Sequence, residues 1–289
     1  MPKNTYHEKQ DKENIEKMRE VLKELPSFAA KYFRSIEDVT SAKTKLAYAY
    51  DLRVFFNFLK ENNPALKNAD LRSLPVSVLE RITREDIEEY LDYCSLYEKK
   101  DGQEVQNAEL GKKRKLASLR SFYKYFFTAE LIEKDPAALV PMPKIHEKTI
   151  VRLDADETAD LLDLVEDGDG LTKAEKRFHE KTKVRDLALM TLLLGTGIRV
   201  SECVGLDLSD IDFKNNGILI RRKGGKEQEV YFGDEVEDAL LSYLEERKRR
   251  IPASGHEQAL FLSMQNKRIT VRAVENLVKK YASKITTLK

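Results

Sequence analysis

The spacing of apolar residues predicts a helical first half of the chain. Apolar positions recur at three- and four-residue intervals in residues 15–25, 41–59, 83–94 and 112–128, which is typical of amphipathic helices. Ser41 precedes one of these helices as an N-cap, and Thr83 with Asp86 resembles a capping box. The polar stretch 98–110 predicts a loop. We therefore expect a four-helix bundle over about residues 27–130.

The second half of the chain has a mixed pattern. Short helices are expected at residues 156–165 and 199–206, with a polar insertion at 166–183 and an apolar run from Arg185 to Leu194 between them. Three β-like runs follow, and helices resume at 234–251 and 270–284. This order predicts a mainly α fold with a small antiparallel three-stranded sheet, whose strands are "DIDF", "GILIRR" and "QEVYF", separated by turn sequences.

Helix-breaking residues divide the chain between these halves. Asp135-Pro136 and the prolines at 141 and 143 interrupt regular structure, which indicates a linker. A length of 289 residues also fits two domains of about 150 residues each. The predicted division is a helical N-terminal extension over 1–26, a helical domain over 27–130, a linker over 131–150 and a mixed α/β domain over 151–289.

Composition excludes several classes of protein. No run approaches the roughly 20 apolar residues of a membrane span, and the polar N-terminus does not resemble a secretory signal. Cys94 and Cys203 lie apart within apolar helical patterns, as expected of buried free thiols in a reducing cytoplasm. The histidines are scattered, at positions 7, 146, 179 and 256, without metal-ligand spacing. We expect a cytoplasmic protein that uses no metal or cofactor.

Charge is segregated along the chain although its formal sum is only +1. Residues 111–129 carry six Lys or Arg and no acid, whereas residues 154–169 carry eight acids and no base. The basic run fits a phosphate-binding face, or simply a solvated helix surface.

Two positions could carry phosphate chemistry. Arg199 follows a Gly195-Thr196-Gly197 turn after one residue, with Glu202 three residues further on the same helical face. The pair could form an oriented phosphate clamp or an ordinary surface salt bridge, and spacing alone does not separate the two. Lys223 stands at a Gly-Gly hairpin turn, where it could act as a mobile general acid or be an ordinary exposed turn lysine.

A family resemblance bears on these alternatives. The segment T-G-I-R-V-S-E at 196–202, followed by V-G-L, resembles the first conserved box of the tyrosine recombinases of the integrase and Xer class. The hairpin "ILIRRKGGKEQEVYF" is similar to that family's lysine-bearing β-hairpin, and Arg185-Asp186 also fits the pattern. Residues 41–58 resemble the second helix of its SAM-like core-binding domain. The resemblance covers about residues 27–289.

The resemblance implies strand cleavage and rejoining through a 3′-phosphotyrosyl intermediate, without metal or nucleotide. Arg199 would be the first phosphate-clamping arginine, Glu202 its orienting acid, and Lys223 the general acid for the 5′-oxygen. The family also implies a homotetramer on double-stranded DNA with an inverted-repeat site. The expected DNA contacts are Ser41, Lys43, Thr44, Lys112, Lys113, Arg114, Lys115, Arg120, Arg221, Arg222 and Lys226.

The sequence departs from the family pattern in its second box and nucleophile. No H-x-x-R follows Arg199, and the later tyrosines are Tyr231 in a hairpin strand and Tyr243 and Tyr281, which we expect to pack in helices. We therefore expect a chain truncated before the second box, which binds DNA without cutting it and is monomeric off DNA. The alternatives are a non-enzymatic DNA-binding regulator or dominant-negative fragment, and a helical protein–protein adaptor.

Overall fold

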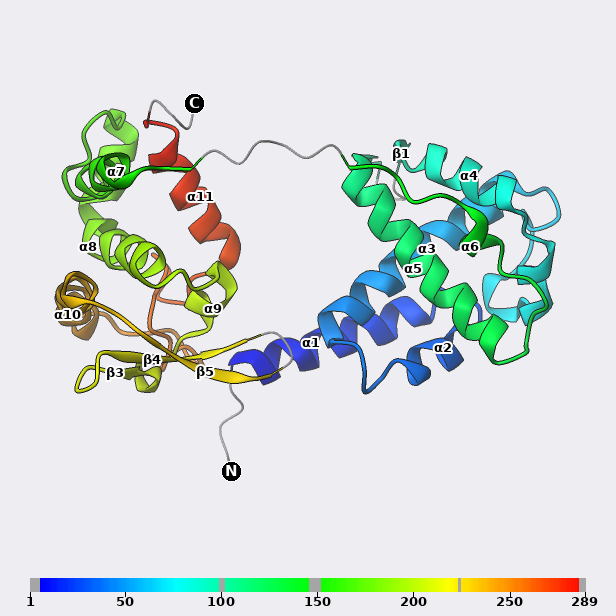
Figure 1. The fold of residues 1–289 in the computed structure, drawn as a ribbon, viewed down its shortest axis with the longest axis horizontal. Coiled ribbons are helices and arrows are strands. Elements are labelled where there is room, and N and C mark those ends of the chain that lie inside the picture. The colour runs from blue at the N-terminus through cyan, green and yellow to red at the C-terminus, as the bar shows by residue number, and fades with distance from the viewer. Residues whose placement is uncertain (1–5, 99–101, 146–151, 223–224, 286–289) are drawn as a thin grey trace. The chain divides into compact units, whose positions relative to one another are not determined.

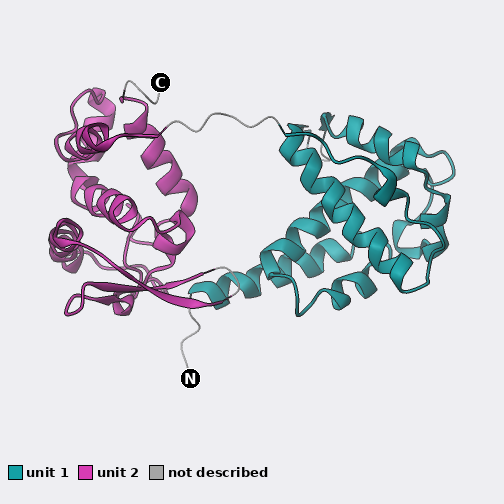
Figure 2. Ribbon diagram, in the orientation of Figure 1, with its two compact units in different colours: residues 1–148 teal, residues 149–289 magenta. Residues whose placement is uncertain are grey.

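The structure is a computed structural model that describes residues 6–98, 102–145, 152–222 and 225–285. Figure 1 shows its elements along the chain. The chain divides into two compact units, unit 1 (residues 1–148) and unit 2 (residues 149–289), which are coloured separately in Figure 2. Among the described helices, none is long and apolar enough to cross a membrane.

Unit 1 is built almost entirely of helices. The main ones are α1 (Tyr6–Leu22), α2 (Ala29–Ser35), α3 (Ala42–Asn62), α4 (Arg84–Tyr93), α5 (Glu109–Thr128) and α6 (Pro136–Leu139), with 3-10 turns at Leu71–Ser73 and Val76–Arg81. The predicted N-caps of α3 and α4 are confirmed, whereas α1 and α5 begin earlier than the apolar pattern indicated, at Tyr6 and Glu109. The Ser41 hydroxyl accepts the Thr44 N–H at 3.3 Å, and Thr83 and Asp86 form the expected capping box.

Aromatic side chains fill the core of unit 1. Phe56 of α3 and Phe122 and Phe126 of α5 are buried, and all three rings pack against Phe28. α1 packs along α3 and buries Met18 and Val21 in the same core, so the first helix belongs to this unit. The predicted limits at residues 27, 130 and 150 stay predictions.

The prediction of a loop over 98–110 was wrong in part. Strands β1 (Leu96–Glu98) and β2 (Glu104–Gln106) pair antiparallel, with Tyr97 opposite Val105. Strands of three residues, each with one acid at an end, are too short to show an apolar alternation in the sequence.

Unit 2 combines helices with one small sheet. Its elements are α7 (Ala155–Asp167), α8 (Lys173–Thr196), α9 (Val200–Gly205), a 3-10 turn (Leu208–Asp210), β3 (Ile211–Asp212), β4 (Gly217–Arg221), β5 (Glu227–Tyr231), α10 (Asp234–Lys248) and α11 (Val271–Ala282). The strands pair antiparallel in the order β3-β4-β5, which confirms the predicted sheet and the mainly α fold class.

The predicted polar insertion at 166–183 is instead largely helix. α8 begins at Lys173, where Thr172 and Glu175 form a capping box. Its polar first half still buries His179, whose ring lies 2.8 Å from the Val165 carbonyl oxygen. A single buried histidine among charged residues gives too weak an apolar period to predict this half of the helix.

The core of unit 2 includes the two tyrosines that were expected to pack. Tyr243 of α10 and Tyr281 of α11 are fully buried, which confirms that expectation. The Tyr243 hydroxyl donates to the Leu260 carbonyl at 3.2 Å and accepts the Leu262 N–H at 3.0 Å. Cys94 in unit 1 and Cys203 in unit 2 are buried free thiols, as predicted.

Candidate active site

Arg199, the first of the predicted site residues, lies just beyond the end of α8. Gly197 caps α8 with a left-handed φ of 64°, a conformation that favours glycine, and its N–H donates to the Leu193 carbonyl at 3.0 Å. Ile198 is buried next, and Arg199 then becomes the N-cap of α9. The backbone of Arg199 is thus fixed between two helices.

Glu202 holds Arg199 in two ways. One carboxylate oxygen accepts the Arg199 backbone N–H at 2.8 Å, and the other accepts its guanidinium Nη1 at 2.9 Å. The Glu202 side chain is only 4% exposed, whereas that of Arg199 is 65% exposed. Arg199 and Glu202 therefore pair as their spacing suggested, with a buried carboxylate bonded to a guanidinium that faces solvent.

Arg222 is a third member that the spacing did not predict. It follows β4, and its Nη1 lies 3.3 and 3.5 Å from the two Glu202 oxygens. Its Nε donates to the Gln228 side-chain oxygen of β5 at 2.9 Å. The sheet brings this arginine to a carboxylate 20 residues earlier in the chain, which helical spacing cannot reveal. Arg199, Glu202 and Arg222 are called the Glu202 cluster below.

The electrostatics of the cluster keep Glu202 ionised. Burial raises the pKa of Glu202, but the hydrogen bonds from Arg199 and the charges of Arg222 and Arg199 outweigh it, so the pKa lies below its ordinary value. One carboxylate faces two guanidinium groups, and the cluster carries a net charge of about +1. Such an arrangement attracts an anion.

The other predicted site residues of the β4–β5 hairpin are Arg221, Lys223 and Lys226. Lys223, the predicted general acid, lies outside the described residues. Arg221 pairs with Glu227 across the hairpin at 3.2 Å. Lys226 is exposed, and its carbonyl accepts the Arg222 N–H at 2.7 Å.

Arg185 and Asp186 are buried within unit 2. Arg185 donates to Asp186 at 2.6 Å and to the Leu262 carbonyl at 3.1 Å, while Asp186 also accepts from Thr182 at 2.8 Å. These bonds tie α8 to the segment that precedes α11. The contacts of Arg185 and Asp186 thus hold the fold of unit 2 together.

Several predicted DNA contacts on α5 are engaged inside unit 1. Lys115 is only 4% exposed and bonds the buried Asp51 of α3 at 3.2 Å, so its ammonium is not at the surface. Arg114 pairs with the same carboxylate but is half exposed. Arg120 donates to the carbonyls of residues 137, 138 and 140. The burial of Lys115 thus argues against the expected contact of its ammonium with DNA. The guanidinium of Arg120 is held by backbone carbonyl groups.

Other predicted contacts of unit 1 remain accessible. Ser41 and Lys43 are exposed at the start of α3, Thr44 is partly exposed, and Lys112 and Lys113 are partly exposed on α5. Ser41 and Thr44 also bond each other at 2.9 Å.

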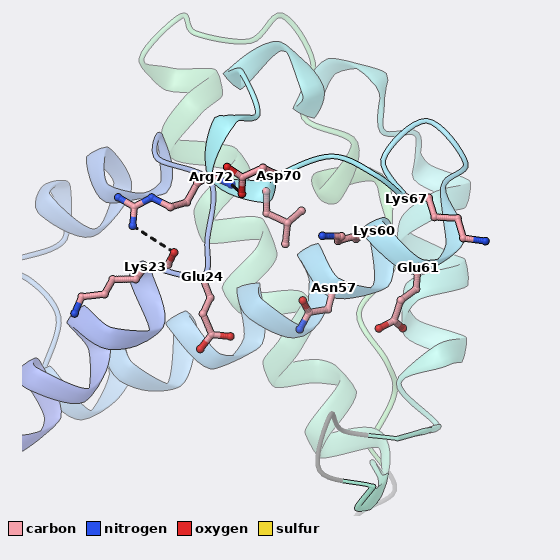
Figure 3. A pocket seen from close by; sticks show the side chains of 9 residues that line it. Lys23, Glu24, Asn57, Lys60, Glu61, Lys67, Asp70 and Arg72 are labelled. Atoms are coloured by element: carbon pink, nitrogen blue, oxygen red, sulfur yellow. Dashed lines mark hydrogen bonds between the residues drawn. The ribbon is translucent and has the colours of Figure 1, made fainter.

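A separate cavity of unit 1 contains none of the predicted site residues. Figure 3 shows its mixed lining, where Arg72 donates to the Lys23 carbonyl at 3.4 Å. The cavity measures about 550 Å³, and four bases and three acids line it, so it presents no strong field of one sign. They are Lys23, Lys60, Lys67, Arg72, Glu24, Glu61 and Asp70.

Comparison with known proteins agrees with this architecture. The phage integrase family matches residues 152–287, and the phage integrase N-terminal SAM-like domain matches residues 30–130. The tyrosine recombinase XerC of Caldanaerobacter subterraneus subsp. tengcongensis is 33% identical, covering 86% of this chain and 66% of the relative. The tyrosine recombinase XerS of Streptococcus uberis is 31% identical, covering 93% and 82% respectively.

Solved structures show the same fold at lower identity. The Tn1549 transposon integrase in complex with circular intermediate DNA has a TM-score of 0.57 at 21% identity, covering 90% of this chain and 80% of that one. A lambda integrase tetramer bound to a Holliday junction has a TM-score of 0.56 at 15% identity, covering 88% and 62%. With both domains matched in order, the chain belongs to the phage integrase family and is an Xer-like tyrosine recombinase.

Proposed function

We propose that this chain binds an inverted-repeat site in double-stranded DNA during site-specific recombination, and that it lacks the nucleophile within its 289 residues. The single observation that carries this proposal is the Glu202 cluster. A guanidinium that is fixed by a buried carboxylate and open to solvent is suited to the two free oxygens of a phosphodiester.

In the reaction that the family resemblance implies, the main requirement is to stabilise the negative charge that develops on the phosphate oxygens. Attack of a tyrosine hydroxyl on phosphorus forms the phosphotyrosyl bond and breaks the bond to the 5′-oxygen, which takes up a proton. Arg199 would stabilise the charge that develops on the phosphate oxygens, and Lys223 would protonate the leaving oxygen. Lys223 directly follows Arg222, whose guanidinium reaches Glu202, and this favours a role near the same phosphate.

The tyrosines after Arg199 support the absence of a nucleophile. Tyr243 and Tyr281 are fully buried, and burial raises the pKa of both phenols. Tyr231 is exposed on β5, but its hydroxyl bonds the Glu229 carboxylate at 3.0 Å, which raises the pKa of Tyr231. None of these hydroxyls is poised as an activated nucleophile.

In the cell, we place the protein in the cytoplasm, acting on DNA. The assembly proposed for a full-length protein of this kind is a homotetramer on two DNA sites. The lambda integrase match is itself a tetramer on a Holliday junction.

The proposal is tested by selecting bound duplexes from a random DNA pool and assaying the selected site for strand cleavage. We expect inverted-repeat sequences to be enriched, and no protein–DNA adduct on a denaturing gel with a nicked substrate. Failure to retain any duplex at low salt would refute DNA binding and favour the adaptor alternative. A covalent adduct would refute the missing nucleophile.

A further inference from the structure

The Glu202 cluster holds more positive charge than its own carboxylate neutralises. A guanidinium nitrogen of Arg199 and one of Arg222 each lie within 3.5 Å of a Glu202 oxygen, so both arginines share one buried carboxylate. The described contacts use Nη1 of Arg199, and Nη1 and Nε of Arg222. Because a guanidinium carries five N–H donors, each arginine retains donors for a second acceptor.

A second carboxylate in the molecule shows why exposure matters here. Asp51 also faces two cations, of which Arg114 is 48% exposed but Lys115 only 4%, so one of the two is closed to solvent. In the Glu202 cluster the carboxylate is the buried member, whereas the side chains of Arg199 and Arg222 are 65% and 30% exposed. Both cations of the Glu202 cluster are thus open to an external ligand.

Besides its ion pair with Glu202, Arg222 is held by two neutral contacts. Gln228 holds Nε through a neutral amide oxygen, and the Arg222 backbone N–H closes the hairpin on the Lys226 carbonyl at 2.7 Å. By contrast, the neighbouring Arg221 is paired with an acid on the opposite strand. Arg222 is therefore positioned by the sheet and shares its acidic partner, Glu202, with Arg199.

We infer that Arg222 is a second phosphate-binding residue, which with Arg199 grips one DNA phosphodiester over the shared Glu202. The inference rests on the proposed function and adds a residue to that site. The net charge of about +1 on the cluster equals in size the charge of one phosphodiester, so binding brings the site to neutrality. Two guanidinium groups also supply more donors than the two free phosphate oxygens need.

The test is the salt dependence of binding to a labelled duplex of arbitrary sequence, followed by fluorescence anisotropy with the full chain. Each lost phosphate contact lowers the magnitude of the negative slope of log K against log salt by about 0.9. We expect Arg199→Ala and Arg222→Ala each to lower it by about 0.9, and the double variant by about 1.8. Lys248→Ala on α10 removes an equal charge outside the cluster and should leave the slope unchanged.

The double variant separates direct contact from positioning. If Arg222 only supported Arg199, the double variant would show the slope of Arg199→Ala alone, and the inference would be overturned. An unchanged slope for Arg222→Ala, with a reduced one for Arg199→Ala, would overturn it equally. If Arg199→Ala also left the slope unchanged, the proposed phosphate role of this site would fail with it. Thermal melts check that every variant is folded.

Discussion

Two buried carboxylates, Asp51 and Glu202, each serve two cations, with different consequences. Burial raises the pKa of Asp51, although Lys115 and Arg114 oppose the rise. The two cations come from α5, so Asp51 joins α3 to α5 within the core. At Glu202 burial is outweighed by the hydrogen bonds from Arg199 and the charges of Arg222 and Arg199, so the pKa of Glu202 is lowered. Asp51 therefore holds two helices together, while Glu202 supports an exposed cationic site.

Glu202→Gln should reveal a pH-dependent part of the stability. Because the folded pKa of Glu202 lies below its ordinary value of 4.5, its contribution is full above that pH and is lost as pH falls through the folded pKa. We expect the variant to be less stable by about 1.5–3 kcal/mol at pH 7, the range for hydrogen bonds to a charged group. Urea unfolding of both proteins between pH 7 and pH 3 measures the difference.

The expected result is a stability difference between the two proteins that shrinks below pH 4.5. Glu245→Gln is the matched control, because its exposed pairing with Lys248 should contribute little. A difference between wild type and Glu202→Gln that stays constant down to pH 3 would contradict the ionised state assigned to Glu202.

The sequence predicted residue pairs that are close along the chain and missed those that are distant. Arg199 and Glu202 are three positions apart on one helix, so helical geometry alone brings them together. Lys115 meets Asp51 across 64 positions, and Arg222 meets Glu202 across 20. A basic residue looks the same in sequence whether its partner is DNA or a buried acid, so the burial of Lys115 could not be predicted.

At the scale of elements, the turn between α8 and α9 depends on two glycines with different constraints. Gly197 has a φ of 64°, and a Cβ added there would meet no atom within 4 Å. Gly195 lies inside α8, where an added Cβ would lie 2.7 Å from the Val236 side chain of α10. Backbone conformation limits the residues that position 197 can accept, and packing limits those that position 195 can accept.

Gly197→Ala should therefore lower the free energy of unfolding by about 1 kcal/mol through left-handed strain alone. Gly197→Asn should cost less, because Asn tolerates this conformation better. Gly195→Ala should cost about 1–3 kcal/mol, since the α8–α10 contact must shift, and this should exceed its gain in helix propensity. Denaturant titrations compare the three variants. Equal stability of Gly197→Ala and Gly197→Asn would argue against backbone strain at this turn.

Elements were predictable where apolar periodicity was strong and hidden where it was weak. β4 buries Ile218 and Ile220 on one face, and its alternation was visible in the sequence. The first half of α8 carries mostly charged residues and depends on contacts such as His179 with Val165, while β1 and β2 are only three residues long. Periodicity reports burial, so elements that bury little escape it.

At the scale of the whole molecule, each unit has hydrophobic packing of its own. The large core of unit 1 draws its buried residues from positions 18–140. A cluster in unit 2 draws its residues from positions 161–281 and joins α7, α8 and α11. Separate cores of this kind are expected of domains that can fold alone.

The final prediction concerns how the two units share DNA binding. If both contact one duplex, as the proposed function implies, the second contact is intramolecular, and the full chain should bind about 10²–10⁴-fold more tightly than either fragment. Fragments 1–148 and 149–289, divided at the boundary of the units, can be compared with the full chain on the selected duplex. Circular dichroism first establishes that each fragment is folded. A folded fragment that binds as tightly as the full chain would show that one unit alone carries the affinity, because linkage adds nothing when only one module touches the ligand.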